Sequence, residues 1–373
     1  MRQDGGKVLS MNASVYSLAE QIENTDILDR LILSLRSRRP KVSASLPFTA
    51  YSSGKMLQIW INTPACRFSL KGKCAACDYW DGVRSESAIR GVCDYIKSLG
   101  SRYETLLLNT CGSCMCEDEL PFDDLMAVVH AISETSVRRI VLETHLAYAT
   151  IEKMAVIKNV LADRDVCLEY GQESTSSDVL KFCLNKPSML LKYDVVEELQ
   201  KMGVHIIANV LLGIPFLSVR QRIEDAIASI RDLLERGIDE IMLFPVNIKP
   251  YTLVQFLYDN KFYKRVNAYE IVKVLSAFND DELERIGLAW IEPDREKIEA
   301  YDCMGLGPGY CEKCGRRLLE YLLEYRDSHT GRERKNAVAK MENETCSCIE
   351  SLYDYTYPDI KSAYEFRRNS LKG

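Results

Sequence analysis

Histidine is scarce in this chain of 373 residues, which contains only His130, His145, His205 and His329. Metal sites built from imidazole are therefore disfavoured, and softer sulfur ligands are expected wherever a metal is bound. Long apolar runs are also missing, since no stretch of about 18 apolar residues predicts a membrane span. The first residues lack the charged start and apolar core of a signal peptide. We therefore expect a cytoplasmic protein with no membrane partner.

A positive net charge is missing as well, because the formal net charge is −6 and the isoelectric point is near 5.5. A protein that coats nucleic acid through bulk electrostatics would be basic, so that class is disfavoured. The candidate basic patches are residues 36–41 and 331–340, and each is more typical of a solvated linker or helix face. The sequence shows no low-complexity segment and no solenoid-length repeat, and its 47% hydrophobic content is enough to bury a core.

Cysteine, in contrast, is abundant, with 14 residues in the chain. A small secreted protein would use them for disulfide bonds, but this chain is neither small nor predicted to be secreted, and the cytosol keeps thiols reduced. Clustered cysteines in a reducing compartment indicate metal binding or thiolate chemistry. The same C-x7-C-x2-C spacing occurs twice, first at Cys66, Cys74 and Cys77 and again at Cys303, Cys311 and Cys314. Spacing alone does not decide which segment carries the main chemistry.

Strand-like and helix-like patterns alternate through the middle of the chain. Six apolar runs predict strands, each followed by a helical or mixed segment, at residues 56–62, 104–109, 138–144, 166–172, 204–213 and 239–247. This order implies parallel pairing through right-handed crossovers, and continuous apolar strands fit a sheet that is covered on both faces. We therefore predict the α/β class with a partial (β/α)6 barrel, whose function lies at the carboxyl ends of the strands.

Both ends of the chain depart from this alternation. Amphipathic helices are predicted over residues 14–36, one more strand over 287–293 and a helix over about 316–341. We expect an N-terminal helical extension at 1–44, a barrel at 45–295 and a cysteine-containing C-terminal extension at 296–373.

The first cysteine segment follows directly after a predicted strand. Three cysteines could hold zinc together with a fourth ligand, or three irons of a [4Fe-4S] cluster with one iron left open. Structural zinc sites usually combine two ligand pairs. Here Cys66 stands alone, seven residues before Cys74, and no fourth cysteine or histidine lies in the same loop. The pattern therefore favours a cluster with an open position, at the mouth of the barrel.

At this point the sequence resembles the radical S-adenosylmethionine (SAM) enzymes. Their usual spacing is C-x3-C-x2-C, but the branches similar to the elongator catalytic subunit and to the archaeosine-biosynthesis subunit widen the first gap. The resemblance covers roughly residues 45–315. It is carried by "CRFSLKGKCAACDYW", "LLLNTCGSC" with "DELP", "IVLETH", "LEYGQES" with "LNKP", "VLLGIPFLSVRQRIEDAI", "FPVNIKPYTLVQFLY" and "YCEKCG".

The resemblance implies a [4Fe-4S] cluster on Cys66, Cys74 and Cys77, whose open iron chelates the amino and carboxylate groups of SAM. Reductive cleavage would give methionine and a 5'-deoxyadenosyl radical that abstracts hydrogen from substrate, with ferredoxin or flavodoxin as electron donor. In the archaeosine branch the implied reaction is C–N cleavage of a lysine adduct on a deazaguanine base in tRNA. Because this chain is acidic, a small molecule or peptide is an equally good substrate class. The alternative hypothesis is a zinc-stabilised α/β binding or scaffold protein without SAM chemistry.

The resemblance also implies roles for residues at the predicted strand ends. The end of the second predicted strand would bind the methionyl amino group of SAM. The ends of the third and fourth strands would contact the SAM amine and ribose. The glycine after the fifth strand would let the backbone approach adenine. Ala76 stands where relatives place a bulkier residue against adenine, and Tyr79 or Trp80 would substitute. The candidate SAM-binding residues are Ala76, Asn109, Thr110, Gly112, Ser113, Glu143, Glu173 and Gly213. Lys186 could contact the SAM carboxylate or cap a helix.

The remaining cysteines leave several alternatives open. Cys111, Cys114 and Cys116 follow the second strand and could bind a second metal, form a redox pair, donate hydrogen to a substrate radical, or be incidental. For the second segment, Cys303, Cys311 and Cys314 with Cys346 or Cys348 as fourth ligand could hold an auxiliary [4Fe-4S] cluster, structural zinc, or no metal. The last three, Cys93, Cys167 and Cys183, are expected to be small core residues.

Overall fold

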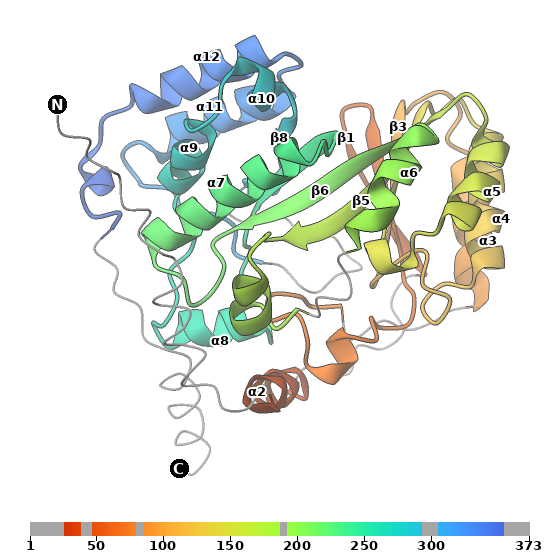
Figure 1. Ribbon diagram of the computed structural model, residues 1–373, viewed down its shortest axis with the longest axis horizontal. Helices are drawn as coiled ribbons and strands as arrows, with labels where there is room; N and C mark the ends of the chain where they lie inside the picture. The colour runs from red at the N-terminus through yellow and green to blue at the C-terminus, as the bar shows by residue number, and fades with distance from the viewer. Residues whose placement is uncertain (1–25, 39–46, 80–85, 187–191, 293–304, 354–373) are drawn as a thin grey trace.

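The computed structural model describes residues 26–38, 47–79, 86–186, 192–292 and 305–353. Its centre is an eight-stranded sheet in which the strands are ordered β1 to β8, as they occur in the sequence (Figure 1). β1 (Phe48–Ser53) is antiparallel to β2 (Met56–Ile61), and every later pair is parallel. The other strands are β3 (Thr105–Thr110), β4 (Arg139–Glu143), β5 (Asp165–Glu173), β6 (Val204–Leu212), β7 (Glu240–Pro245) and β8 (Ile286–Leu288). The predicted partial α/β barrel is therefore confirmed.

All six predicted strands are present, and the additional strand expected at 287–293 overlaps β8, which is shorter and ends at Leu288. β1 was not predicted, because four of its six residues are exposed and it lacks the apolar run of the other strands. It forms a hairpin with β2 through a tight turn at Gly54, which has a φ of +54°. β1 therefore covers the edge of the parallel sheet beside β2.

Helices connect the parallel strands and cover the outer face of the sheet. In Figure 1, α3, α4 and α5 lie beside one another at one side of the molecule, and α9 to α12 gather near β8 at the other. The connecting helices are α3 (Glu86–Lys97), α4 (Phe122–Ser133), α5 (Ile151–Leu161), α6 (Val196–Lys201), α7 (Val219–Glu235), α8 (Leu253–Asp259), α9 (Ala268–Leu275) and α10 (Asp280–Glu284). The longest of them, α7, begins with a capping box in which Ser218 and Gln221 satisfy each other's backbone N–H groups.

The terminal helices differ from the sequence prediction in one respect. The N-terminal helix is α2 (Asp26–Arg36), and the rest of the predicted 14–36 segment lies outside the described residues. The single helix predicted over 316–341 is wrong, because the chain forms α11 (Gly315–Asp327) and α12 (Gly331–Glu342). The break has a local cause, since Thr330 and Glu333 form a capping box that starts a new helix. Among the described residues, no helix is long and apolar enough to cross a membrane.

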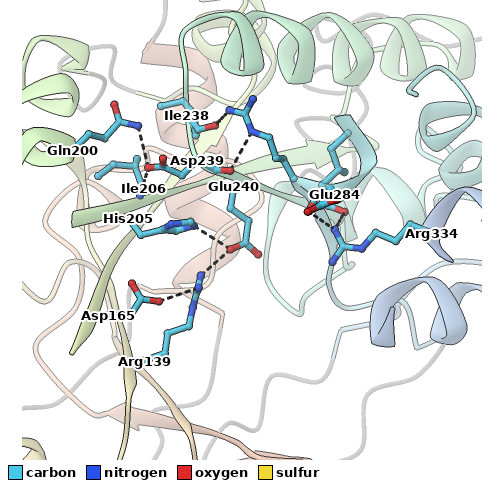
Figure 2. Close-up of polar contacts among 12 residues, drawn as sticks. Arg139, Asp165, Gln200, His205, Ile206, Ile238, Asp239, Glu240, Glu284 and Arg334 are labelled. Carbon is cyan, nitrogen blue, oxygen red and sulfur yellow. Dashed lines mark hydrogen bonds and ion pairs between the residues drawn. The ribbon is translucent and has the colours of Figure 1, made fainter. Parts of the chain in front are cut away.

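The inner face of the sheet is apolar in the middle and polar at both ends. Val141, Cys167 and Ile207 form a small buried cluster there. Towards the amino ends of the strands, Figure 2 shows Arg139 between Asp165 and Glu240, at N–O distances of 3.1 and 2.8 Å.

These charged residues begin β4, β5 and β7, so they close the amino end of the half-barrel. His205 Nε2 reaches the same Glu240 at 3.4 Å, and Asp239 accepts hydrogen bonds from Gln200 and from the backbone N–H of Ile206 (Figure 2). Because these contacts close the amino end, the functional site is expected at the carboxyl ends of the strands.

Candidate functional site

The first cysteine segment forms a loop directly after β2, at the carboxyl edge of the sheet. Cys66 is buried, while Cys74 and Cys77 are partly exposed. The backbone N–H of Cys66 donates to Tyr79 O at 2.8 Å, and that of Cys77 donates to Cys74 O at 3.1 Å, so the loop folds back on itself. The N–H of Tyr79 points at the sulfur of Cys77, with an N–S distance of 3.3 Å.

Helix α2 holds this loop from its outer side. The Arg36 guanidinium is buried and donates to the carbonyl groups of Ser69, Lys73 and Cys74, the last two at 3.0 and 3.2 Å. Lys73 also forms an ion pair with Asp29 of the same helix, with an N–O distance of 2.7 Å. The expectation that the basic segment at 36–41 is a solvated linker is therefore wrong for Arg36, while residues 39–41 lie outside the described part.

The segment after β5 contacts the same loop from the other side. Asn185 O accepts the backbone N–H of Cys74 at 3.2 Å, and Leu184 O accepts that of Ala75 at 2.8 Å. Cys74 itself has a φ of +63°, a conformation that a residue with a side chain adopts only when its surroundings impose it. Ala76, the predicted adenine contact, is half-buried and packs against an apolar cluster around α2 and α8.

Burial keeps the thiols of the first segment neutral in the absence of a metal. It raises the pKa of Cys66 to about 12, with the nearby Glu119 carboxylate adding to the effect. The pKa values of Cys74 and Cys77 are also raised, again because burial disfavours the thiolate. A bound metal would reverse this preference, since a coordinated thiol is deprotonated outright.

The loop after β3 places Gly112 against Cys66. A Cβ at Gly112 would lie 3.1 Å from Cys66 Cβ and would collide with the carboxylate of Glu119. That carboxylate accepts the backbone N–H groups of Ser113 and Arg67, at 2.6 and 3.1 Å, and so ties the two loops together. The structure thus brings the predicted methionyl-binding loop next to the first cysteine of the triad, although the SAM-binding roles of its residues stay predictions.

A chain of amide and carboxyl groups crosses the inner face near the carboxyl ends of the strands. Gln58 donates to Asn109 at 2.7 Å, and Asn109 in turn donates to Glu143. On the neighbouring strands, Asn209 donates to Glu169 at 2.8 Å. Two of the predicted residues, Asn109 and Glu143, are therefore in contact.

The carboxyl groups of Glu143 and Glu169, which belong to these hydrogen-bonded groups, have raised pKa values. Burial raises the pKa of Glu143 to about 8, with a further contribution from the charge of Glu169. Burial also raises the pKa of Glu169 to about 7. Glu169 was not singled out from the sequence, because it sits within an apolar strand rather than at its end. The available signal was the alternation of β5, in which Glu169 and Glu173 have the same parity.

Glu173 and Lys186 form an ion pair at the end of β5, with an N–O distance of 3.0 Å. Glu173 has a φ of +67° and lies beside an irregularity in the pairing of β5 with β6. Lys186 also donates to Gly171 O, and its expected contact with the SAM carboxylate stays a prediction. The residue fixes the strand end that carries Glu173.

Gly213 and Thr110 occupy the ends of β6 and β3. Gly213 has a φ of +101°, and Val266 fills the space that a Cβ would need, which gives this glycine a packing reason of its own. Within the described part of the chain, the buried hydroxyl of Thr110 has no hydrogen-bond partner. A buried polar atom of this kind at a strand end is consistent with a ligand contact.

Lys249 was missed from the sequence although it lies at the triad. Its ammonium group is 2.6 Å from Asp78, the residue after Cys77, and lies above the rings of Tyr79 and Trp290 at 5.1 and 5.2 Å. The sequence signal for the contact with Asp78 was the position of Lys249 in the loop after β7, at the carboxyl end of a predicted strand. A fixed cation beside the triad suits an anionic group of a bound cofactor.

The donor set and its surroundings fit an iron–sulfur cluster. Three thiols come from one loop at the carboxyl edge, the N–H of Tyr79 points at one of them, and the ion pair of Lys249 with Asp78 adjoins Cys77. The sulfurs are not crowded as they would be around one ion, because the triad is not among the groups of described residues whose ligand atoms all lie within 4.8 Å. The same holds for Cys111, Cys114 and Cys116, which are buried and form no such group.

The second cysteine segment is closely packed. The sulfurs of Cys311, Cys314, Cys346 and Cys348 all lie within 4.8 Å of one another. Cys346 and Cys348 both take part, whereas the sequence left the choice between them open. The predicted ligand Cys303 lies outside the described residues. The other expected core residues, Cys167 and Cys183, are buried in apolar clusters, and Cys93 is half-buried at the edge of the main core.

Comparison with known proteins gives homologues at low sequence identity. No model of a known protein family matches the chain. It is 26% identical over 231 residues to archaeosine synthase subunit beta of Methanosarcina acetivorans, covering 59% of this chain and 66% of the relative, just under two thirds. The protein of the same name from Thermococcus kodakarensis is 24% identical over 232 residues, with 60% and 71% of the two chains covered.

Solved structures with similar folds include methylornithine synthase, at a TM-score of 0.41 and 14% identity, with 91% of this chain and 95% of that chain covered. Queuine lyase from Clostridium spiroforme, bound to SAM and queuine, gives a TM-score of 0.39 and 18% identity over 54% and 80% of the two chains. The homologues confirm the resemblance that the motifs carry, because the chain is similar to archaeosine synthase subunit beta from two organisms.

Proposed function

We propose that this chain reductively cleaves SAM at a [4Fe-4S] cluster held by Cys66, Cys74 and Cys77. The reduced cluster would supply the electron that cleaves the bond between sulfur and the 5' carbon of SAM. The chemistry so supplied would be abstraction of a hydrogen atom from a C–H bond of the substrate, with methionine and 5'-deoxyadenosine as the products of SAM. The observation that carries the proposal is the contact of the triad loop with Gly112 at the carboxyl edge of the sheet, where a cofactor on the triad would meet the strand ends.

The residues at the strand ends would hold and orient SAM. The 109–113 segment and Glu143 would receive the methionyl amino group, and Glu173 would receive the ribose hydroxyls. Glu173 is preset for this role by its ion pair with Lys186. The backbone at Gly213 and the side of Ala76 would face adenine. Because these groups are already tied into hydrogen bonds, little reorganisation is needed when the cofactor binds.

For the substrate, the inner face favours a molecule with N–H donors. Glu169 and Asn209 lie on β5 and β6, and the described structure leaves the buried Asn209 Oδ1 without a partner. Two acceptors at this depth suit an amine, an amidine or the edge of a purine-like base. We propose C–N bond cleavage on a modified base in tRNA, which the resemblance to the archaeosine branch implies, with a free small molecule or a peptide as the other substrate classes.

Two kinds of partner follow from this proposal. An electron donor such as ferredoxin or flavodoxin would reduce the cluster. Two of the relatives are named as subunits, so a second chain could supply the basic surface that this chain, with a net charge of −6, lacks overall.

The proposal is tested by iron content and by the response of the cluster to SAM. Anaerobically purified chain should be brown, contain about four irons, and show a changed electron paramagnetic resonance signal when SAM is added to the reduced protein. Cys74→Ala should lose both properties, while Cys93→Ala, at a half-buried position in α3, should keep both. A colourless wild-type protein that holds only zinc would favour the scaffold hypothesis and reject the proposal.

A further inference from the structure

The four thiols of the C-terminal extension form a second site that the SAM reaction does not use. Cys311 and Cys314 lie just before α11, and Cys346 and Cys348 lie just after α12. The sulfurs of Cys311 and Cys346 are 3.8 Å apart, and those of Cys314 and Cys348 are 3.7 Å apart. We propose that these four cysteines bind one zinc ion in a closed, tetrahedral, structural site.

The sulfur spacing distinguishes a single ion from the alternatives. A Zn–S distance of about 2.3 Å places the sulfurs of a regular tetrahedron about 3.8 Å apart. The two measured separations of 3.8 and 3.7 Å agree with this edge. A four-iron cluster binds each thiolate to a different iron, so its sulfurs stand farther apart than those that share one ion. A disulfide needs an S–S distance of about 2.05 Å, which is far shorter.

The chain around the first ligand pair is shaped for this geometry. The segment reads Cys-Glu-Lys-Cys-Gly, and the backbone N–H groups of Lys313 and Cys314 point at the sulfur of Cys311. A Cβ at Gly315 would lie 2.6 Å from Tyr310 Cβ, so the tight turn into α11 requires glycine. Two cysteine pairs, each close in sequence, are typical of structural zinc. This ligand set is complete without Cys303.

A neighbouring hydroxyl supports the site from the barrel side. The hydroxyl of Tyr269 of α9 is within hydrogen-bond reach of both the sulfur of Cys314 and Glu344 O, the latter at 3.2 Å, and its single proton is shared between them. Donors to ligand atoms of this kind orient a metal site and tune its affinity. Arg317 pairs with Glu344 at 2.7 Å and links α11 to the segment that carries the second cysteine pair.

The ion would fasten the two C-terminal helices onto the last strand. Tyr325 of α11 and Arg334 of α12 donate to Ile286 O, at 2.7 and 2.9 Å, and so satisfy part of the exposed edge of β8. Upstream of the site, Leu306 exchanges backbone hydrogen bonds with Ile248 at 3.0 Å, next to Lys249. Zinc binding would therefore stabilise the covered edge of the sheet and, through residue 306, the loop that carries Lys249.

The proposal is tested by counting zinc and iron separately in the full-length protein. Wild type, purified anaerobically, should hold one zinc in addition to any iron. Cys311→Ser and Cys348→Ser should each lose the zinc and keep the wild-type iron content, with Cys93→Ser as the matched control that keeps both. Loss of about four irons with Cys311→Ser would show an auxiliary cluster and overturn the zinc assignment.

A measurement on wild type alone keeps the proposal testable if a variant does not fold. Cobalt exchanged into the chain should give the intense visible absorption of a tetrahedral thiolate complex, and zinc should compete it away. Absence of that absorption, or intact mass showing disulfides among these cysteines in freshly purified protein, would overturn the proposal. Zinc content and SAM cleavage are measured independently. A protein that does not cleave SAM could therefore still confirm the zinc site, and a protein without zinc could still confirm the radical reaction.

Discussion

Arg36 shows how one residue supports the triad from outside the barrel. Its guanidinium is 6% exposed and faces backbone carbonyl groups of the cysteine loop, including Lys73 O at 3.0 Å and Cys74 O at 3.2 Å. It also donates to Cys77 O at 3.4 Å, so the residue fixes the backbone at two of the three cysteines.

Replacing this arginine should loosen the cysteine loop. Arg36→Met removes the donors and leaves buried carbonyls unsatisfied, which costs about 1–3 kcal/mol for each group that water cannot reach. We expect the free energy of unfolding to fall by roughly 3 kcal/mol, and iron to be lost faster to a chelator. Urea unfolding and the rate of iron release measure the two effects. Arg38→Met, at an exposed position two residues later, is the control; equal behaviour of the two variants would contradict this role for Arg36.

The buried carboxyls predict how stability depends on pH. Glu143 and Glu169, with pKa values of about 8 and 7 against 4.5 in the unfolded chain, keep their protons in the folded protein longer than in the unfolded one. The folded state therefore binds more protons between these limits, and the free energy of unfolding falls as the pH rises through this window. Glu169 alone would contribute on the order of 3 kcal/mol to this fall.

Urea unfolding of the purified protein at a series of pH values between about 5 and 8 measures this dependence. Glu169→Gln should flatten the curve, because the amide does not titrate. Glu104→Gln, at an exposed position that is ion-paired with Lys55, is the control and should keep the wild-type slope. Stability that rises with pH in wild type would show that the carboxyls are stabilised as anions and that their assigned environment is wrong.

Some of these residues could be predicted from the sequence and others could not. Asn109 and Glu143 were predictable, because they end apolar strands and the carboxyl ends of parallel strands meet at one edge. Arg36 was not, since it lies in a run of basic residues and its partners are carbonyl groups of a distant loop. Lys249 likewise acquires its role only through the fold, which brings it to Asp78.

At the scale of elements, the side chain of Arg334 ties α12 to the segment that leads into β8. Arg334 donates to Leu283 O, Glu284 O and Ile286 O, at 2.8, 3.0 and 2.9 Å, and Figure 2 shows it reaching the segment that leads into β8. The end of α10 and the start of β8 therefore depend on a helix that follows them in the sequence. This attachment and the proposed zinc site act on the same pair of helices.

Removing that attachment should release α12 before the barrel unfolds. Arg334→Met leaves the three carbonyl groups without their donor, and we expect a loss of about 2–3 kcal/mol. Hydrogen exchange should rise first in α12 and β8, while the central strands stay protected. Arg332→Met, exposed on the same helix, should leave exchange unchanged. Uniform loss of protection across all strands would mean that the extension and the barrel unfold as one unit.

Strands and helices could be predicted from the sequence where the pattern of apolar residues reflects how the element is packed. Strands β2 to β7 are apolar runs because both faces of the sheet are covered, and they were predicted. β1 was not predicted because its exposed residues carry no such pattern. The break between α11 and α12 was not predicted either, although Thr330 and Glu333 have the spacing of a capping box. The domain boundaries at residues 44/45 and 295/296 stay predictions.

In the whole molecule, the two ends of the parallel strands carry different groups of residues. The charged group around Glu240 closes the amino end of the half-barrel, whereas the cysteine triad, the 109–113 segment and Lys249 lie at the carboxyl end. The C-terminal extension covers the edge at β8. This arrangement assigns the two cysteine segments different tasks: the first would carry the cofactor, and the second would hold the structure around it.

The most direct test is the release of 5'-deoxyadenosine from SAM by reduced, anaerobic protein, compared among wild type, Cys66→Ala, Cys311→Ala and Cys93→Ala. We predict release by wild type and Cys93→Ala, none by Cys66→Ala, and retained release at a reduced thermal stability for Cys311→Ala. Release by Cys66→Ala at the wild-type rate, or no release by wild-type protein that holds its iron, would contradict the account.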